Sequence, residues 1–112
     1  MTDCLFCKMV NGDIKPDVVY DDDQVLAFRD LHPQAPMHVL VIPKRHIANL
    51  NQLDDAALGG HMLQVAAKLA AQFGYAESGY RTLFNCNDDG GQTVHHLHLH
   101  VLGGRRMHWP PG

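Results

Sequence analysis

The sequence has no basic excess, no long apolar run and too few cysteines for a disulfide-stapled fold. Its formal net charge is −3, whereas general nucleic-acid binders usually carry a basic surplus, so no nucleic-acid partner is predicted. No stretch of about 18 apolar residues is present, which predicts that the chain does not span a membrane. The N-terminus MTDCLFCKMV shows no secretory pattern. Three cysteines, one pair of them spaced as C-x-x-C, are typical of metal or redox use, and the predicted location is the cytoplasm.

The sequence also lacks three common catalytic motifs. It has no glycine-rich loop ending in Lys-Ser/Thr and no G-x-G-x-x-G after a strand, which disfavours ATP-driven phosphoryl transfer and dinucleotide redox chemistry. It has no G-x-S-x-G serine motif either. What it has in excess is histidine, since nine histidines stand against nine Lys and Arg together. Because imidazole titrates near neutral pH, this composition favours acid–base chemistry, metal binding or both.

The length of 112 residues predicts a single domain over residues 1–112. Apolar residues at steps of three and four predict one long helix, which begins after Asp54 or Asp55 and ends at Gly74. A short helix is expected over Cys4–Val10. The expected strands are Val18–Tyr20, Val25–Phe28, His38–Ile42, Tyr80–Phe84 and Val94–Leu102. Five strands with short connections and one long helix predict an α+β domain with an antiparallel sheet.

Histidine alternates with apolar residues along the last expected strand, in the segment HHLHLHVL at residues 95–102. Because side chains alternate between the two faces of a strand, His96, His98 and His100 are expected to share one face. Three interpretations follow: a solvent-facing sheet surface, a set of zinc ligands, or a catalytic row with one imidazole as nucleophile. The polar turn at residues 85–93 favours the catalytic row, since successive backbone N–H groups in a glycine turn bind anions.

The run HLHLHVL at residues 96–102 resembles the signature of the histidine-triad (HIT) family. The segments DLHPQAP at 30–36, HVLVIPK at 38–44, GGQ at 90–92 and MHWPPG at 107–112 are similar to the Hint branch of that family. The resemblance implies a HIT-like fold: a five-stranded antiparallel sheet with one long and one short helix, extended across a homodimer. It also implies a purine nucleoside phosphoramidase, which releases amines from adenosine or guanosine phosphoramidates and hydrolyses aminoacyl-adenylates.

The resemblance implies a role for each matching histidine. His98 would be the nucleophile that attacks the α-phosphorus and forms a nucleotidyl-histidine intermediate. His38, on the neighbouring strand, would orient that imidazole, and His100 would hydrogen-bond a phosphate oxygen. His96 would complete the catalytic row as its first histidine. No cofactor is required for this chemistry.

Further positions match the nucleotide contacts of the family. Asp30 matches a carboxylate that binds both ribose hydroxyls, while Phe6 and Leu31 match apolar walls of a base pocket. The positions that match contacts to the phosphate and the leaving group are Asn85, Gln92 and Thr93. Trp109 matches a tail residue that shapes the leaving-group site of the partner subunit. These matches imply purine nucleoside monophosphate derivatives as ligands and a homodimer as the assembly.

Cys4 and Cys7 form a C-x-x-C pair whose use the sequence leaves open. Together with His46 and His96 they resemble the zinc set of other branches of the family, and two thiolates with two imidazoles make a closed, tetrahedral structural zinc site. The Hint branch with this tail usually lacks the cysteine pair. The alternative is therefore two ordinary thiols on a short helix.

Two functions other than turnover at a histidine nucleophile remain open at the level of sequence. One is a sensor or scaffold that binds nucleotides without cleaving them, although such a protein has no need of the middle histidine. The other is a zinc-dependent hydrolase that uses two or three histidines of the row as metal ligands.

Overall fold

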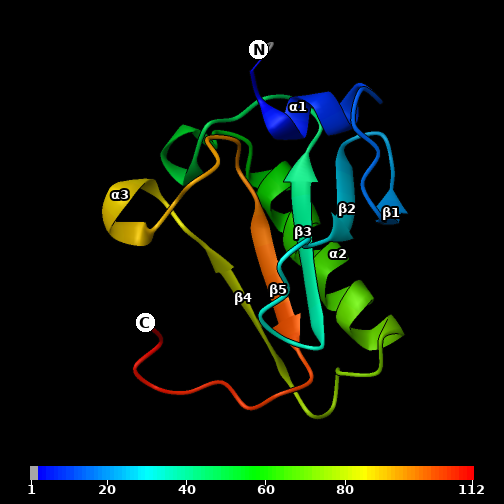
Figure 1. Cartoon of the computed structure of the whole chain (residues 1–112), viewed down its shortest axis with the longest axis vertical. Helices are drawn as coiled ribbons and strands as arrows, with labels where there is room; N and C mark the ends of the chain where they lie inside the picture. The colour runs from blue at the N-terminus through cyan, green and yellow to red at the C-terminus, as the bar shows by residue number, and fades with distance from the viewer. Residues whose placement is uncertain (1–2) are drawn as a thin grey trace.

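Five strands form one antiparallel sheet in the computed structural model, which describes residues 3–112 (Figure 1). The strands are β1 (Val18–Asp21), β2 (Val25–Arg29), β3 (Met37–Pro43), β4 (Tyr80–Phe84) and β5 (Leu99–Gly103). Their order is β1-β2-β3-β5-β4, and every neighbouring pair is antiparallel, as the sequence predicted. The first two residues of the predicted domain 1–112 lie outside the described range.

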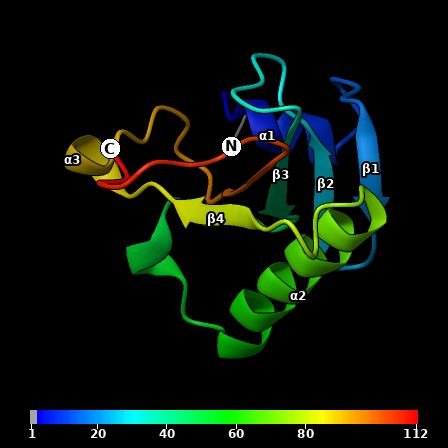
Figure 2. The ribbon, with the colours of Figure 1, turned by 90° about the horizontal axis from the view of Figure 1, so that it is seen from below.

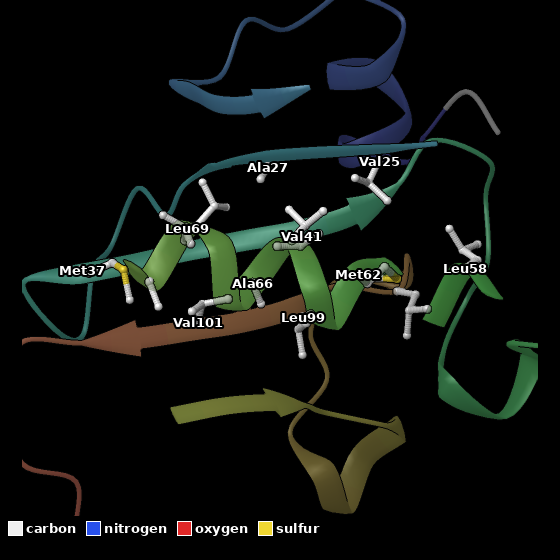
Figure 3. Packing of buried hydrophobic residues seen from close by; sticks show 14 of the residues in the cluster. Val25, Ala27, Met37, Val41, Leu58, Met62, Ala66, Leu69, Leu99 and Val101 are labelled. Carbon is white, nitrogen blue, oxygen red and sulfur yellow. The ribbon is translucent and has the colours of Figure 1, made fainter. Parts of the chain in front are cut away.

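Helix α2 (Ala56–Gln72) covers one face of the sheet (Figure 2). Its start is fixed by the predicted cap, because the side chain of Asp55 accepts a hydrogen bond from the N–H of Leu58 at 3.1 Å. The predicted apolar stripe faces the sheet and packs on alternate strand residues (Figure 3). The buried stripe residues are Leu58, Met62, Val65 and Leu69. Each such aliphatic side chain contributes about 1.5–3 kcal/mol relative to an exposed one.

Helix α1 (Leu5–Val10) lies on the opposite face of the sheet (Figure 2). Six residues are too few for a helix that is stable by itself, so tertiary contacts must hold it. Phe6 and Met9 provide them by packing in a second apolar cluster. The strand residues of that cluster are Leu26, Phe28, Leu40 and Ile42. The α1 face of the sheet therefore carries its own small core beside the histidines.

Strand β5 begins at Leu99, five residues later than the predicted start at Val94. The β3–β5 register pairs Val41 with Leu99, so Pro43 would stand opposite Leu97 if the ladder continued. Proline has no N–H to donate, which ends the pairing at this point. The N–H of Leu97 instead donates to the carbonyl of Ile47, at 2.6 Å. Residues 94–98 are thus irregular, and this decides where the first histidine of the row lies.

Two short helical turns add to the predicted elements. Helix α3 (Asn87–Gly90) lies within the predicted 85–93 turn, and the 3₁₀ turn η1 (Leu50–Gln52) precedes α2. Gly91 ends α3 at a positive φ of 78°, a conformation that favours glycine. Within residues 3–112, no helix is long and apolar enough to cross a membrane.

Candidate active site

His38 on β3 and His100 on β5 are diagonal neighbours on the α1 face of the sheet, since the register pairs His38 with Leu102 and His100 with Leu40. Nε2 of His38 lies 2.9 Å from Nδ1 of His100. The backbone N–H of Gln34 donates to Nδ1 of His38 at 3.0 Å. Because that nitrogen accepts, the proton of neutral His38 sits on Nε2 and is donated to His100. The proton of His100 is then on its own Nε2.

Burial keeps both imidazoles neutral near pH 7. It lowers the pKa of His38, although the Asp30 carboxylate, with Oδ2 3.5 Å from Nε2, acts in the opposite direction. Burial also lowers the pKa of His100 to about 4, and the neighbouring imidazoles of His98 and His38 add to the effect. Nε2–H of His100 is therefore a neutral, fixed hydrogen-bond donor.

The backbone carbonyl of His96 fixes the tautomer of His98. Nδ1 of His98 donates to this carbonyl at 2.7 Å, so Nε2 keeps its lone pair. Within residues 3–112 this Nε2 has no hydrogen-bond partner, and it is not sealed from solvent. Burial lowers the pKa of His98, which keeps the ring neutral. The expectation that His38 orients His98 is therefore corrected: a carbonyl two residues upstream does so, and His38 contacts His100.

His96 lies on the same face as His98, as the alternation predicted, because the ring of Phe6 packs against both. Leu97, between them, lies in the core cluster on the other face. His96 precedes β5, its side chain is fully buried, and its Nε2 donates to the carbonyl of Pro43 at 2.8 Å.

The rings of His98 and His100 lie side by side, with centroids 5.0 Å apart. Because pairing with β3 stops at Pro43, His96 lies outside the ladder, and its ring contacts Cys4 and His46. His96 is thus a positioning residue that acts through its carbonyl.

A cavity of about 500 Å³ opens beside α1, at the end of β2 and the residues that follow it. Among its lining residues are four predicted nucleotide contacts, namely Phe6, Asp30, Leu31 and Thr93. The rest of the lining is largely apolar, as in a small-molecule site that receives a flat ring. Phe6 also packs edge-on against the ring of His98, with centroids 5.2 Å apart. One side chain therefore joins the cavity to the imidazole with the free Nε2.

The structure places Gln92 differently from the expectation that its side chain contacts the phosphate. Gln92 is buried, and its Nε2 donates to the carbonyls of Ala48 and Val94 at 2.8 and 3.1 Å. Its Oε1 accepts from the N–H of Asn87 at 2.9 Å. Both amide N–H groups are used, so the side chain holds the 87–94 loop instead of meeting a ligand.

Two further predicted residues do not line the cavity. Asn85 follows β4 and lies against Gly90 of α3. Trp109 is 83% exposed on the C-terminal tail, whose path is fixed by a hydrogen bond of 3.0 Å from Arg81 to the carbonyl of His108. Within one chain neither residue lines this cavity, and their roles stay predictions.

The four residues of the predicted zinc set meet in what we call the thiol–imidazole cluster: Cys4, Cys7, His46 and His96. Their ligand atoms all lie within 4.8 Å of one another. Nδ1 of His96 is 3.3 Å from Sγ of Cys4, and Nδ1 of His46 is 3.3 Å from Sγ of Cys7. Burial, with a hydrogen bond to Cys4, raises the pKa of the Cys7 thiol to about 11. A divalent cation would reverse that effect by stabilising the thiolate.

This donor set fits a zinc ion. Two sulfur and two imidazole ligands suit tetrahedral Zn²⁺, and four protein ligands leave no open position. His96 is prepared for coordination because its Nε2–H is already donated to Pro43, which leaves the lone pair of Nδ1 facing the thiols. Such an outer hydrogen bond is typical of histidines that bind metals.

Sequence reasoning missed the groups that set the tautomers. They are the N–H of Gln34 and the carbonyls of Pro43 and His96. Every residue carries a carbonyl and nearly every residue an N–H, so no residue type marks these positions. Only the signal of Pro43, which ends a strand, was visible in the sequence.

Comparison with known proteins gives a consistent result. The profile of the family described as HIT domain matches residues 11–107. An uncharacterized HIT-like protein of Synechococcus elongatus is 54% identical over 112 residues, which cover 98% of this chain and 97% of that protein. An Escherichia coli protein named purine nucleoside phosphoramidase is 49% identical over 106 residues, covering 92% of this chain and 88% of that protein.

Solved structures show the same likeness. A HIT family hydrolase from Legionella pneumophila superposes with a TM-score of 0.96 at 54% identity, over 98% of this chain and 100% of that one. A histidine triad protein from Clostridium difficile gives a TM-score of 0.92 at 44% identity, over 96% of each chain. The predicted HIT-like fold is confirmed. With the family profile spanning residues 11–107 and relatives of this identity, the chain belongs to the HIT domain family.

Proposed function

We propose that this chain is a hydrolase that cleaves the P–N bond of adenosine or guanosine 5′-phosphoramidates, and also cleaves aminoacyl-adenylates, through a nucleotidyl-histidine intermediate. The observation that carries the proposal is the 2.7 Å hydrogen bond from Nδ1 of His98 to the carbonyl of His96, which leaves Nε2 neutral and free. The purine nucleoside phosphoramidase name of the Escherichia coli relative supports the same substrate class.

In the first step, Nε2 of His98 attacks the α-phosphorus and the P–N bond breaks. The leaving amine takes a proton, and a nucleotidyl group remains on His98. Nε2–H of His100 donates to a phosphate oxygen as charge develops there. A donor held in advance at this position stabilises the transition state without reorganisation, an effect of about 3–4 kcal/mol for one donor in other enzymes.

In the second step, water attacks the phosphorus and the N–P bond to His98 breaks. The products are a nucleoside monophosphate and the free imidazole, so the cycle closes without a cofactor. Two displacements replace one difficult one. We assign the cavity beside Phe6 and Leu31 to the base and Asp30 to the ribose hydroxyls, because the largely apolar lining and the carboxylate of Asp30 suit these two parts.

The decisive experiment compares the wild-type protein with His98→Ala on an adenosine phosphoramidate that fluoresces after cleavage. We expect turnover to fall by about 10⁴-fold or more, as when other covalent nucleophiles are removed, while AMP binding measured by calorimetry persists. His95→Ala is the matched control, because His95 is an exposed histidine three positions before His98. Near wild-type turnover in His98→Ala would exclude the covalent mechanism.

The same assay separates the two alternative functions. A sensor or scaffold would bind AMP but show no turnover in the wild type. A hydrolase that uses the row histidines as zinc ligands would lose turnover when the metal is removed. Retained turnover in protein shown by elemental analysis to be metal-free would exclude that second alternative.

We further propose that the thiol–imidazole cluster holds a structural zinc ion, with Cys4, Cys7, His46 and His96 as its ligands. When bound, the ion would supply a cross-link between α1 and the segments before α2 and β5, and it would leave catalysis to the imidazoles. Elemental analysis should find one zinc per chain. Cys7→Ala should lower this content strongly, whereas Cys86→Ala should not, and equal content in both variants would refute the site.

The assembly proposed is a homodimer. Among the strands described, β4 is an edge with a neighbour on one side only, and such an edge is a ready partner for another strand. Light scattering should give a mass of twice 12.5 kDa, and a monomer would contradict the proposal. The three free thiols suit a reducing compartment, and the cytoplasm is the location we propose.

A further inference from the structure

The thiol–imidazole cluster is accessible from one side. Cys4 and His46 line an open hollow of about 710 Å³, together with Ala48 and His95. Cys7, by contrast, is buried behind them. A small reagent in solution therefore reaches Sγ of Cys4 first, and Sγ of Cys7 lies within 4.8 Å of it. This arrangement places one accessible and one sheltered thiol side by side.

The cluster is joined to the proposed nucleophile through a single residue. Nδ1 of His96 lies 3.3 Å from Sγ of Cys4 and 3.6 Å from Sγ of Cys7. The carbonyl of the same residue accepts the 2.7 Å hydrogen bond that sets the tautomer of His98. A displacement of His96 that follows a change at the thiols therefore changes the group that orients the nucleophile.

A second connection runs through helix α1. Cys4 is the N-cap of this helix, and its Sγ accepts from the N–H of Cys7 at 3.2 Å. One residue of this helix, Phe6, packs edge-on against both His96 and His98, with centroids at 5.8 and 5.2 Å. Phe6 also lines the 500 Å³ cavity. Anything that reshapes the first turn of α1 therefore alters the wall of the proposed nucleotide pocket.

We propose that Cys4 and Cys7 are a redox-active pair, and that their oxidation by a hydroperoxide to a disulfide expels the zinc ion proposed for the cluster and disables the nucleotide site. The turnover readout rests on the proposed function, whereas the binding and spectroscopic readouts below do not. The proposal assigns a modification site to the cluster and a consequence for His98.

Hydrogen peroxide is the oxidant that accepts the two electrons lost by the thiols. Sγ of Cys4 attacks one oxygen of hydrogen peroxide and the O–O bond breaks, so that Cys4 sulfenic acid forms while the other oxygen takes the thiol proton and leaves as water. Sγ of Cys7 then attacks the Cys4 sulfur and forms the S–S bond, while the sulfenic oxygen takes the Cys7 proton and leaves as a second water. Two thiols are oxidised and one peroxide is reduced. A thiol reductant returns the pair to its starting state.

Closing the disulfide changes the geometry that the two connections depend on. An S–S bond of about 2.0 Å draws both sulfur atoms toward each other and imposes its own dihedral angle. The sulfur atoms lose their thiol protons, or the zinc ion that they held, so Nδ1 of His96 and Nδ1 of His46 lose these polar partners. His96 and the first turn of α1 then lose these contacts together. Both touch His98, His96 through its carbonyl and α1 through Phe6.

The experiment uses the full-length Cys86→Ser variant, in which Cys4 and Cys7 are the remaining thiols. The protein is treated with hydrogen peroxide and then with dithiothreitol. Free thiols, mass and zinc content are measured at each stage. AMP affinity is followed by calorimetry, and the Nδ1–H resonance of His98 by NMR spectroscopy.

After peroxide treatment we expect no free thiols, and we expect the mass of the protein to fall by that of two hydrogen atoms. The dissociation constant for AMP should rise about tenfold, the scale of losing a group that orients a functional histidine. The Nδ1–H resonance of His98 should disappear or shift, turnover should fall, and dithiothreitol should restore all three. Cys4→Ser and Cys7→Ser in the same background should show no reversible response.

Two results would overturn the proposal. One is an intramolecular disulfide, shown by mass, that leaves AMP affinity and the His98 resonance unchanged. The other is consumption of the thiols without that disulfide. If the reduced protein binds AMP but never turns over, the proposed enzymatic function fails, while the response of binding and of the His98 resonance still decides the redox proposal.

Discussion

Nε2 of His38 donates to Nδ1 of His100 across 2.9 Å, a contact between residues 62 positions apart in sequence. It joins two strands and dictates that His100 presents an N–H at Nε2. The N–H of the loop residue Gln34 donates to Nδ1 of His38 and so keeps the His38 proton on Nε2. A chain of donors thus runs from a backbone amide to the nitrogen proposed to meet the phosphate.

Alanine substitutions at His38 and at His100 should both lower kcat, but by different amounts. We expect His100→Ala to reduce kcat by about 100-fold, because it removes the donor itself. His38→Ala should reduce kcat by about tenfold, because it removes only the group that sets the tautomer of His100. Steady-state kinetics on an adenosine phosphoramidate provide the measurement. Thermal melts should show both variants folded, and a larger loss in His38→Ala would contradict this order.

Deleting the nucleophilic ring should leave a site that a free imidazole can enter. In His98→Gly we expect turnover to be negligible without additive and to rise in proportion to added imidazole. The carbonyl of His96 remains available to receive the N–H of the added ring. The product to be measured is AMP, by chromatography. His100→Gly serves as the control, and an equal response there would argue against a role of His98 as nucleophile.

The pH profile should show the nucleophile active at unusually low pH. Burial lowers the pKa of His98 from its ordinary 6.5, so Nε2 stays unprotonated as the pH falls through 6.5. Below the lowered pKa the ring takes a proton and the lone pair is lost. We therefore expect the acid limb of kcat/KM, which reports the free enzyme, to have a midpoint below 6.5. An N-alkyl phosphoramidate substrate keeps substrate titration out of this range, and a midpoint at or above 6.5 would refute the assignment.

Asp22 should be a stabilising residue far from the active site. Its Oδ2 lies 2.6 Å from Nε2 of His61 on α2 and accepts from Tyr20 at 2.7 Å. Burial acts to raise the pKa of Asp22, yet these bonds and two backbone N–H groups hold it well below its usual value. The contribution of Asp22 to the free energy of unfolding is thus present above pH 3.8, the ordinary pKa of an aspartate, and is lost as the pH falls below that value.

We expect Asp22→Ala to lower the free energy of unfolding by about 2 kcal/mol at pH 7, because the half-buried side chains of Tyr20 and His61 and two backbone N–H groups lose their acceptor. Denaturant unfolding is the measurement. Asp23→Ala is the control, since Asp23 is exposed and adjacent. Equal stability of the two variants would show that the network around Asp22 contributes nothing.

The C-terminal tail should influence the leaving group more than the nucleotide. Trp109 is 83% exposed in the single chain, and the family resemblance predicts that it shapes the leaving-group site of the partner subunit. Deleting residues 107–112 retains Arg105, whose Nε donates to the carbonyl of Gln34 at 2.8 Å and supports the loop behind His38. We expect altered kcat/KM ratios across amines of different size with little change in AMP affinity. Unchanged ratios would contradict this role.

Local patterns explain how much of the fold the sequence predicts. The stripe from Leu58 to Leu69 has the period of a helix, and the alternation in residues 97–101 has the period of a strand, so both were found without tertiary information. The exceptions are α3 and η1, which are only one turn long and carry no apolar period. The start of β5 was also missed, because its limit is set by Pro43 on another strand.

The residues that gather at the site were identified by type, but their roles required the tertiary structure. The sequence by itself determined that histidines, a carboxylate and a pair of thiols are present at spacings typical of the family. Which nitrogen of His98 or His100 holds the proton depends on carbonyl and amide groups brought from elsewhere in the fold.

The path of His96 shows the physical reason most clearly. Its place in the sequence predicted the same face as His98, and Phe6 contacts both rings on that face. The ladder stops where Pro43 has no N–H to give, so His96 lies beyond β5, with its ring beside the thiols and its carbonyl accepting from His98. The sequence period therefore determined the face of this side chain, whereas its partners depend on where the strand ends, and the length of a strand is decided by its neighbours.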